Sequence, residues 1–382
     1  MLTFLGRRGR AAAILGALVL AACTSGPPLG PTAVHPEVPG VTPATPAAPT
    51  LAHGRSRWVA VPFSELPGWD GDRTSELWPA LRRGCARPAP AWAAFCTQAA
   101  QLGDPGDAEL RAWLQQRLQA YRVEATDGSA DGLLTGYFEP LVEASRQPRG
   151  AFKLALYAPP ADLASRKPHW TRQQIDTLPA AQAALRGREI AYVADPLDAL
   201  VIQVQGSGRL HLQGTNGSAQ LVRVSFAGTN DQPYKSVGRW LIEQGELKPD
   251  QASWPAIRAW AQRNPKRVNE MLWSNPRYVF FREEPLPDPS LGPRGAQGVA
   301  LTPGRSIAVD PQSIPYGTPV WLASTEPVSS TPLRRLVMAQ DTGSAITGAV
   351  RADYFWGWGE AAEQQAGRMK QPLRLWVLWP RS

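Results

Sequence analysis

Three aspartates near the C-terminus have neighbours that suit acid catalysis. Asp310 lies in IAVDP, Asp341 in AQDTG and Asp353 in RADYF. A carboxyl group beside aromatic side chains loses hydration, which raises its pKa, and carboxyl groups that share a pocket raise one another's pKa further. A carboxylic acid that keeps its proton at neutral pH can protonate a glycosidic oxygen. The structural alternative is a simple turn, because an aspartate close to a glycine often makes only a turn hydrogen bond.

Aromatic neighbours single out Asp353 among the three. Tyr354, Trp356 and Trp358 follow it closely. Apolar walls exclude water and favour a neutral acid, so we expect these three side chains to shield Asp353. Arg351 acts in the opposite direction, since a nearby cation lowers the pKa of a carboxyl group unless it points away.

The remaining polar candidates suggest a carbohydrate ligand. Sugar rings offer apolar faces to flat aromatic rings, while their hydroxyl groups need amide and hydroxyl partners. If both segments are strands, period two places the candidates on shared faces: Gln203, Gln205 and Ser207 on one, and Thr135, Tyr137 and Glu139 on the other. The chain has 15 Trp. We expect most to pack in the core and a minority, with Trp356 first, to line a sugar-binding groove.

The pattern of the chain predicts two β regions with helices around them. Short apolar runs separated by Gly and Asn favour β-barrels over alternating strands and helices. The segments expected as strands are 132–145, 152–160, two strands around a Gly-Ser-Gly turn in 198–215, 219–228, and several after 276. The segments expected as helical are 58–122, with an amphipathic helix at 107–121, and 236–275. This order allows one domain to be inserted in the other.

The N-terminus predicts export and lipid attachment. A basic start precedes a short apolar run that ends in Leu-Ala-Ala-Cys. Residues 1–22 therefore read as a signal peptide, since the run is too short to span a membrane. The cysteine that follows resembles the lipidated Cys23 of bacterial lipoproteins, and Thr24 carries no inner-membrane retention signal. We expect an anchor on the periplasmic face of the outer membrane. Residues 23–54 are rich in Pro and Ala and read as an extended tether.

Composition restricts the remaining classes. The 382 residues are 43% hydrophobic and carry a net charge of +8, which allows two folded domains and suits an anionic polymer, a membrane surface or a merely basic exterior. No dense Lys/Arg run appears, so nucleic acid is not expected as a partner. Cys85 and Cys96 remain after Cys23 and can form a disulfide in the periplasm or stay as buried thiols. Four His without paired spacing predict no metal site, and we expect no cofactor.

Several motifs together resemble one family. TGYFEP, IQVQGSG, QPYKSVG and the C-terminal series AVDPQSIPYGTPVWL, AQDTGSAITGAVRADYFWGWGEAAEQQAG and LWVL are similar to the membrane-bound lytic murein transglycosylase A family, in the same order over about residues 58–380. The C-terminal part resembles the 3D module, whose three aspartates match Asp310, Asp341 and Asp353. The resemblance implies a mainly β protein: a double-psi β-barrel built from 55–138 and 276–382, with a second β-barrel at 139–275 inserted in it and a glycan groove between them.

The resemblance also implies an activity. A lytic transglycosylase cleaves the bond between N-acetylmuramic acid and N-acetylglucosamine without water and leaves a 1,6-anhydro end. Asp353 is expected as the acid and base, with Asp341 and Asp310 orienting it or stabilising positive charge. Two alternatives stay open. A hydrolase needs a second carboxylate, from Asp341 or Glu139, and an expansin-like wall-binding protein needs none. The expected partners are peptidoglycan strands, the membrane through the lipid and, beyond these, proteins of wall synthesis or division.

Overall fold

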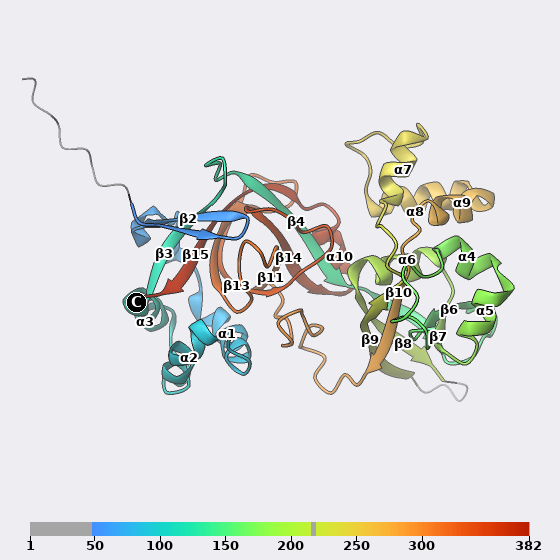
Figure 1. Ribbon diagram of the computed structural model, residues 1–382, viewed down its shortest axis with the longest axis horizontal. Helices are drawn as coiled ribbons and strands as arrows, with labels where there is room; N and C mark the ends of the chain where they lie inside the picture. Colours follow the sequence, from blue (N-terminus) through green and yellow to red (C-terminus); the bar gives the residue numbers. More distant parts are fainter. Residues whose placement is uncertain (1–47, 215–218, 382) are drawn as a thin grey trace, which may run out of the picture. The chain divides into compact units, whose positions relative to one another are not determined.

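The computed structural model describes residues 48–214 and 219–381. In these ranges the chain forms two β-sheets with helices at their periphery (Figure 1), so the expected mainly β fold is confirmed. No helix in the same ranges is both long and apolar enough to cross a membrane. The predicted signal peptide and Cys23 lie outside the described residues.

The first sheet has nine strands in the order β1-β2-β3-β15-β12-β13-β11-β14-β4. Their bounds are β1 (Thr50–His53), β2 (Ser56–Val61), β3 (Leu118–Ala125), β4 (Gly132–Glu139), β11 (Ser306–Val309), β12 (Pro319–Thr325), β13 (Pro332–Asp341), β14 (Arg351–Trp358) and β15 (Lys370–Pro380). An additional pairing of β15 with β4 closes six of these strands into a ring. Buried apolar side chains of these strands, such as Ile307, Val337 and Leu375, pack against one another in one hydrophobic core.

The second sheet has six strands in the order β10-β9-β8-β5-β7-β6. Their bounds are β5 (Leu141–Ser145), β6 (Leu154–Tyr157), β7 (Glu189–Val193), β8 (Ser207–Gln213), β9 (Ala219–Thr229) and β10 (Val279–Glu284). Within the described residues, no ladder joins β10 to β6, so backbone pairing does not close this sheet as the expected second barrel requires.

Helices lie beside both sheets. They are α1 (Trp78–Cys85), α2 (Ala93–Ala99), α3 (Asp107–Arg117), α4 (Arg172–Thr177), α5 (Pro179–Leu185), α6 (Pro196–Gln205), α7 (Val237–Glu243), α8 (Trp254–Arg263), α9 (Val268–Trp273) and α10 (Gly359–Ala366). Short 3-10 turns cover Phe63–Glu65, Trp69–Gly71, Thr74–Leu77, Pro90–Trp92 and Pro265–Arg267. The helices at 236–275 are therefore confirmed.

The second sheet is contained in one stretch of the chain. The chain leaves the first sheet after β4, at Pro140, and re-enters it at β11. The expected boundary at residue 275 needs correction, because β10 hydrogen-bonds to β9 in the second sheet. The apolar run of β10 by itself does not indicate which sheet it joins. We propose that the inserted domain covers about residues 140–284 and that the first domain consists of the segments on either side.

The segment expected as two strands around a Gly-Ser-Gly turn is a helix followed by a strand. Asp195 accepts a hydrogen bond from the Leu197 N–H and caps α6, Pro196 occupies its first turn, and Gly206 ends it with φ 79°. Aspartate before proline and a terminal glycine are helix boundary signals. They outweigh the β-branched residues between them, so only the second expected strand, β8, is present.

Two N-terminal expectations also change. The tether was expected to reach residue 54, but Thr50–His53 pairs with β2 as strand β1. The region 58–122 begins and ends in strands, and the helix expected at 107–121 stops at Arg117. Residues 118–125 instead pair with β2 on one side and β15 on the other, and these ladders override the helical spacing of Leu118 and Tyr121.

Candidate active site

A cavity of about 790 Å³ is lined by residues of both sheets. β4 contributes from the first sheet and leads directly into the second (Figure 1), while α6, β9 and β10 contribute from the inserted segment. Of the expected site residues, the cavity lining includes Thr135, Tyr137, Gln203, Gln205, Ser207, Asp341 and Asp353. It does not include Asp310 or Trp356.

Asp353 lies on β14 between two neighbouring strands. The ladder places it opposite Thr135 of β4 and Ala308 of β11. The Thr135 hydroxyl donates to Asp353 Oδ1 at 2.7 Å. The pKa of Asp353 is raised to about 6 in total: burial is the largest cause, the Thr135 hydrogen bond and the charge of Arg351 lower the pKa in part, and the charge of Asp341 adds a smaller increase. The carboxyl group therefore keeps its proton at mildly acidic pH although it lines an open cavity.

Arg351 binds to Thr135 rather than to the acid. Its Nη2 donates to Thr135 Oγ1 at 2.8 Å, and its Nη1 donates to the carbonyl oxygens of Ala352 and Leu133. The threonine hydroxyl thus stands between the guanidinium and Asp353. This arrangement explains why the pKa of Asp353 stays raised although a cation lies two residues away. Arg351 forms no direct ion pair with Asp353, so its charge lowers the pKa less than desolvation raises it.

Asp341 ends β13 and accepts hydrogen bonds with both of its carboxylate oxygens. The Tyr137 hydroxyl donates to its Oδ2 at 2.9 Å and the Ala296 N–H donates to its Oδ1 at 3.0 Å. Burial raises the pKa of Asp341, and hydrogen bonds from Thr342, Tyr137 and Ala296 partly offset this increase. The pKa of Tyr137 lies well above its usual value because of burial and the two nearby aspartates. Tyr137 therefore remains a protonated donor.

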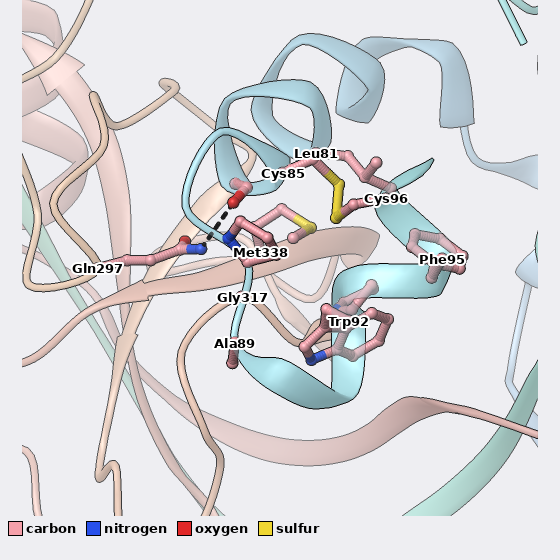
Figure 2. Close-up of a pocket in the computed structure, with 12 residues that line it drawn as sticks. Leu81, Cys85, Ala89, Trp92, Phe95, Cys96, Gln297, Gly317 and Met338 are labelled. Atoms are coloured by element: carbon pink, nitrogen blue, oxygen red, sulfur yellow. Dashed lines mark hydrogen bonds between the residues drawn. A yellow bond between two sulfur atoms is a disulfide. The ribbon is translucent and has the colours of Figure 1, made fainter. Parts of the chain in front are cut away.

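The loop that holds Asp341 is braced from outside the cavity. Gln297 follows Ala296, and its backbone N–H donates to the Gln340 carbonyl at 3.0 Å. Its side-chain amide donates to the Gly84 carbonyl at 3.2 Å, one residue before Cys85. Figure 2 shows Gln297 and the bridge between Cys85 and Cys96 among the residues that line one small pocket, so the disulfide left open by the sequence is present. The bridge ties α1 to α2 next to the support of Asp341.

Asp310 lies away from the cavity. Its Oδ1 accepts from the Gln312 N–H at 2.9 Å and its Oδ2 accepts from the Gly348 N–H at 2.9 Å. The side chain is buried, and Arg55 Nη1 is 3.6 Å from Oδ2. The expectation that Asp310 stabilises charge beside the reacting sugar is therefore corrected, since its oxygens hold the chain before β14 and can orient Asp353 only through that strand.

The two glutamines reach the cavity from a helix. Gln203 Oε1 accepts from Arg172 Nη2 at 2.5 Å, and Gln205 Oε1 accepts from the Phe138 N–H at 3.1 Å. The shared strand face expected for them is wrong, because positions two apart on a helix point about 200° apart. Gln205 instead links α6 to β4, and both side chains line the cavity together with Ser207.

The expected aromatic shield around Asp353 is also wrong. Tyr354 is buried and donates to the Gly304 carbonyl, and Trp356 Nε1 donates to Met369 Sδ at 3.2 Å. The Arg209 guanidinium lies 4.0 Å from the ring centroid of Trp358. These residues are absent from the cavity lining. Alternation along β14 directs Tyr354 and Trp356 to the face opposite Asp353.

Two other aromatic residues line the cavity instead. Phe226 is 49% exposed and Tyr234 is 40% exposed, so their rings are available to a ligand. The sequence pattern does not identify Phe226, because period two groups it with Val222 and Val224, which are buried. The surface that such rings offer suits the apolar faces of sugars.

Comparisons with known proteins show which family this chain resembles. A family model described as "MltA specific insert domain" matches residues 133–282, and one described as "3D domain" matches residues 305–379. The chain is 32% identical to "Membrane-bound lytic murein transglycosylase A" of Vibrio cholerae serotype O1 over 286 residues, which cover 73% of this chain and 72% of the relative. The Escherichia coli K12 protein of the same name is 32% identical over 278 residues, covering 71% and 72%.

Solved structures are similar over most of their length. "Lytic transglycosylase, LtgG, of Burkholderia pseudomallei" is 45% identical with a TM-score of 0.61, covering 89% of this chain and 99% of that one. MltA from Neisseria gonorrhoeae is 31% identical with a TM-score of 0.75, covering 88% and 96%. E. coli MltA "with bound chitohexaose" is 25% identical with a TM-score of 0.65, covering 88% and 95%.

Proposed function

Because the chain belongs to the membrane-bound lytic murein transglycosylase A family, we propose that it cleaves peptidoglycan strands between N-acetylmuramic acid and N-acetylglucosamine, with Asp353 as the catalytic acid and base. The enzyme is a peptidoglycan lytic transglycosylase. The observation that carries the residue assignment is the pKa of Asp353, raised to about 6 on the wall of a cavity large enough for several sugar rings.

The reaction requires one proton carrier. The Asp353 carboxylic acid gives its proton to the glycosidic oxygen as the bond from that oxygen to C1 breaks. The Asp353 carboxylate then takes the proton of the muramoyl C6 hydroxyl, whose oxygen bonds to C1 and closes the 1,6-anhydro ring. No water is consumed, so a second catalytic carboxylate is not needed. Thr135 fixes Oδ1 of Asp353, and Oδ2 accepts no hydrogen bond from the described residues.

Asp341 has a supporting role in this proposal. Its carboxylate lines the same cavity and raises the pKa of Asp353 through its charge. A negative charge there also favours the positive charge that develops at C1. Glu139, the other candidate for a second carboxylate, is fully buried, and Arg209 and Arg223 occupy its oxygens. It is therefore unsuited to act on a sugar.

Product analysis tests the function. Peptidoglycan digested by the protein in ¹⁸O water should yield muropeptides that are free of label and about 20 Da lighter than products hydrolysed in the same water, because ring closure replaces the addition of one labelled water. Mass spectrometry separates this result from the two alternatives. Labelled reducing ends as the main product contradict a transglycosylase and indicate a hydrolase, while no release of muropeptides indicates a wall-binding protein.

The pKa of Asp353 predicts the alkaline limb of the pH profile. The acid must be protonated in the free enzyme, so kcat/KM should be highest below about pH 6. Above that pH, kcat/KM should decrease by up to about tenfold for each pH unit. An acidic limb is expected above the usual pKa of an aspartate, because burial raises the pKa of Asp341, which acts as a carboxylate. Initial rates on solubilised glycan at constant ionic strength measure both limbs. A kcat/KM that rises from pH 6 to pH 8 is incompatible with this assignment.

We also propose that Cys23 carries the membrane anchor. The basis is the Leu-Ala-Ala-Cys sequence after a short apolar run. Cys23→Ala should release an otherwise active protein into the soluble periplasmic fraction, as measured by membrane flotation and immunoblotting. Thr24→Asp is a matched variant that keeps the lipid and should move the protein to the inner membrane. Persistent outer-membrane association of Cys23→Ala at high salt argues for another anchor.

A further inference from the structure

The lining of the cavity carries an excess of positive charge. Five arginines contribute to it, Arg172, Arg277, Arg282, Arg294 and Arg351, against two carboxyl groups, Asp341 and Asp353. The pKa values of both carboxyl groups are raised, which reduces their negative charge at mildly acidic pH. The sugar rings, hydroxyl groups and acetamido groups of a glycan chain are uncharged. A neutral glycan therefore does not explain why so many cations face this cavity.

Four of the arginines already have protein partners. Arg172 donates to Gln203 and to backbone carbonyls, and Arg351 donates to Thr135. Arg282 pairs with Glu284 at 2.8 Å, and Arg294 donates to the Gly298 carbonyl at 2.8 Å. These contacts fix the side chains and partly satisfy their donors.

Arg277 differs from them. Its hydrogen bonds to described residues all run through its backbone: its N–H donates to Asn275 Oδ1 at 3.3 Å, and its carbonyl accepts from Arg172 Nη2 at 2.8 Å. Its guanidinium makes no hydrogen bond or ion pair within residues 48–214 and 219–381, although the residue is partly buried and lines the cavity. A guanidinium offers five donors in a fork that matches a carboxylate. The backbone contacts hold the main chain of Arg277 at the cavity wall and leave this fork unpaired among the described residues.

The substrate carries its negative charge on one branch. In a muramoyl glycan, the 3-O-lactyl group ends either in a free carboxylate or in an amide-linked peptide that has carboxylates of its own. A chito-oligosaccharide has the same sugar backbone without this branch. The branch is thus the part of the substrate that can supply an anion to a cavity otherwise filled by neutral sugars.

We propose that Arg277 binds a carboxylate of the 3-O-lactyl branch and makes the protein select muramoyl glycans over uncharged chito-oligosaccharides. Arg282, which lies opposite Ser225 in the ladder between β10 and β9, lines the same cavity, but its guanidinium is paired with Glu284. The proposal rests on the proposed function, since it names the part of the peptidoglycan substrate that this cavity recognises. It makes Arg277 a specificity-determining residue that takes no part in proton transfer.

Binding measurements in a non-cleaving background test the proposal. Asp353→Asn alone and with Arg277→Gln is titrated by calorimetry with three oligosaccharides of equal length: a peptide-free muramoyl glycan, a peptide-bearing one and a chito-oligosaccharide. Arg277→Gln should weaken binding of a carboxylate-bearing glycan by about tenfold or more, the usual scale for a hydrogen-bonded charged group. Binding of the chito-oligosaccharide should change little. The difference should shrink as salt is added.

Comparison of the three oligosaccharides identifies which part of the substrate supplies the carboxylate. A loss confined to the peptide-free glycan assigns the lactyl carboxylate, and a loss confined to the peptide-bearing glycan assigns a carboxylate of the peptide. Arg277→Lys should recover part of the lost affinity because it keeps the charge. Arg374→Gln removes an equal charge from a side chain paired with Asp131 outside the cavity and should alter none of the three affinities.

Two results overturn the proposal: unchanged affinity for both muramoyl glycans, or an equal loss for all three ligands. Thermal melting of each variant checks that the protein is folded. We expect it to be, because the described contacts of Arg277 use its backbone. These outcomes are independent of the proposed reaction, which is judged from the products of the wild-type enzyme. Anhydro products together with unchanged affinities reject the carboxylate site alone, and hydrolysed products reject the reaction alone.

Discussion

Asp353→Asn lowers the rate of glycan cleavage by about 10²–10⁴-fold, the usual contribution of a general acid. The substitution keeps the size of the side chain and removes the proton that the leaving oxygen must receive. Thr135 can still donate to the amide oxygen that replaces Oδ1. The expected loss is therefore in kcat, with a smaller change in KM. The measurement is release of muropeptides from purified sacculi, together with single-turnover rates on soluble glycan.

The matched control for this loss is Asp131→Asn. Asp131 is an exposed aspartate whose side chain pairs with Arg374 at 3.0 Å outside the cavity. The Asp131→Asn variant should retain the wild-type rate of glycan cleavage. Turnover close to wild type in a folded Asp353→Asn protein contradicts the assignment and makes Asp341 the next residue to test. Residual activity in Asp353→Asn should also lack the alkaline limb, because the group that titrates at about pH 6 has been removed.

Stability gives an independent readout of the same group. The folded-state pKa of Asp353 is about 6, above its value in the unfolded chain. Its contribution to stability is therefore fully present below the unfolded pKa and is lost as the pH rises through about 6. Asp353→Asn removes this dependence, so its melting temperature relative to wild type should be higher at pH 7 than at pH 4. An offset that is constant between these pH values shows that the pKa is not raised.

Glu139→Leu destabilises the fold by about 3–5 kcal/mol, the cost of removing one partner from a buried ion pair. Glu139 ends β4 and is 0% exposed. Arg209 Nε donates to its Oε2 at 2.7 Å, and Arg223 binds both of its oxygens. Without the carboxylate, two arginines from β8 and β9 are left facing each other in a buried site. The measurement is the free energy of unfolding from urea titration at pH 7.

A surface glutamate provides the comparison. Glu143 on β5 pairs with His211, and its side chain is 55% exposed, so Glu143→Leu should change stability by about 1 kcal/mol or less. Equal effects of the two substitutions rule out a structural role for the Glu139 cluster. The same pair separates structure from catalysis, because Glu139→Leu protein that is folded at low temperature should still form anhydro ends. Complete loss of cleavage by such folded protein revives Glu139 as a catalytic carboxylate.

The Glu139 cluster also shows how the two sheets are linked. Both arginines donate to the Leu291 carbonyl in the connection between β10 and β11. Arg209 also lies against the ring of Trp358 at the end of β14. Glu139, the last residue of β4 in the first sheet, thus contacts two strands of the second sheet through Arg209 and Arg223, and these arginines contact the connection that leads back to the first sheet. This arrangement holds the two walls of the cavity together near the strand that carries Asp353.

Local sequence signals determined much of this protein. Short strand-like runs bounded by turn residues predicted strands where β4, β9 and β15 lie, because β-branched and aromatic residues favour extended backbone and Gly, Asn and Pro end it. The order of motifs identified the family and the three aspartates. Two cysteines in a chain with a predicted export signal allowed the bridge that the structure contains. These properties depend on residues close together in the chain or on chemistry that each residue carries with it.

Tertiary structure decided which side chains meet. Asp310 and Asp353 both match the three-aspartate module, but of these two only Asp353 lines the cavity, and the oxygens of Asp310 accept from the backbone N–H groups of Gln312 and Gly348. Arg351 leaves the acid protonated because it binds Thr135, a residue 216 positions earlier in the chain. The pKa of a carboxyl group depends on the groups that surround it in space and on the water that they displace. The spacing of residues in the sequence gives neither the surrounding groups nor the displaced water. Motifs could therefore predict which residues form the site, but the pKa values of its carboxyl groups could be obtained only from the folded chain.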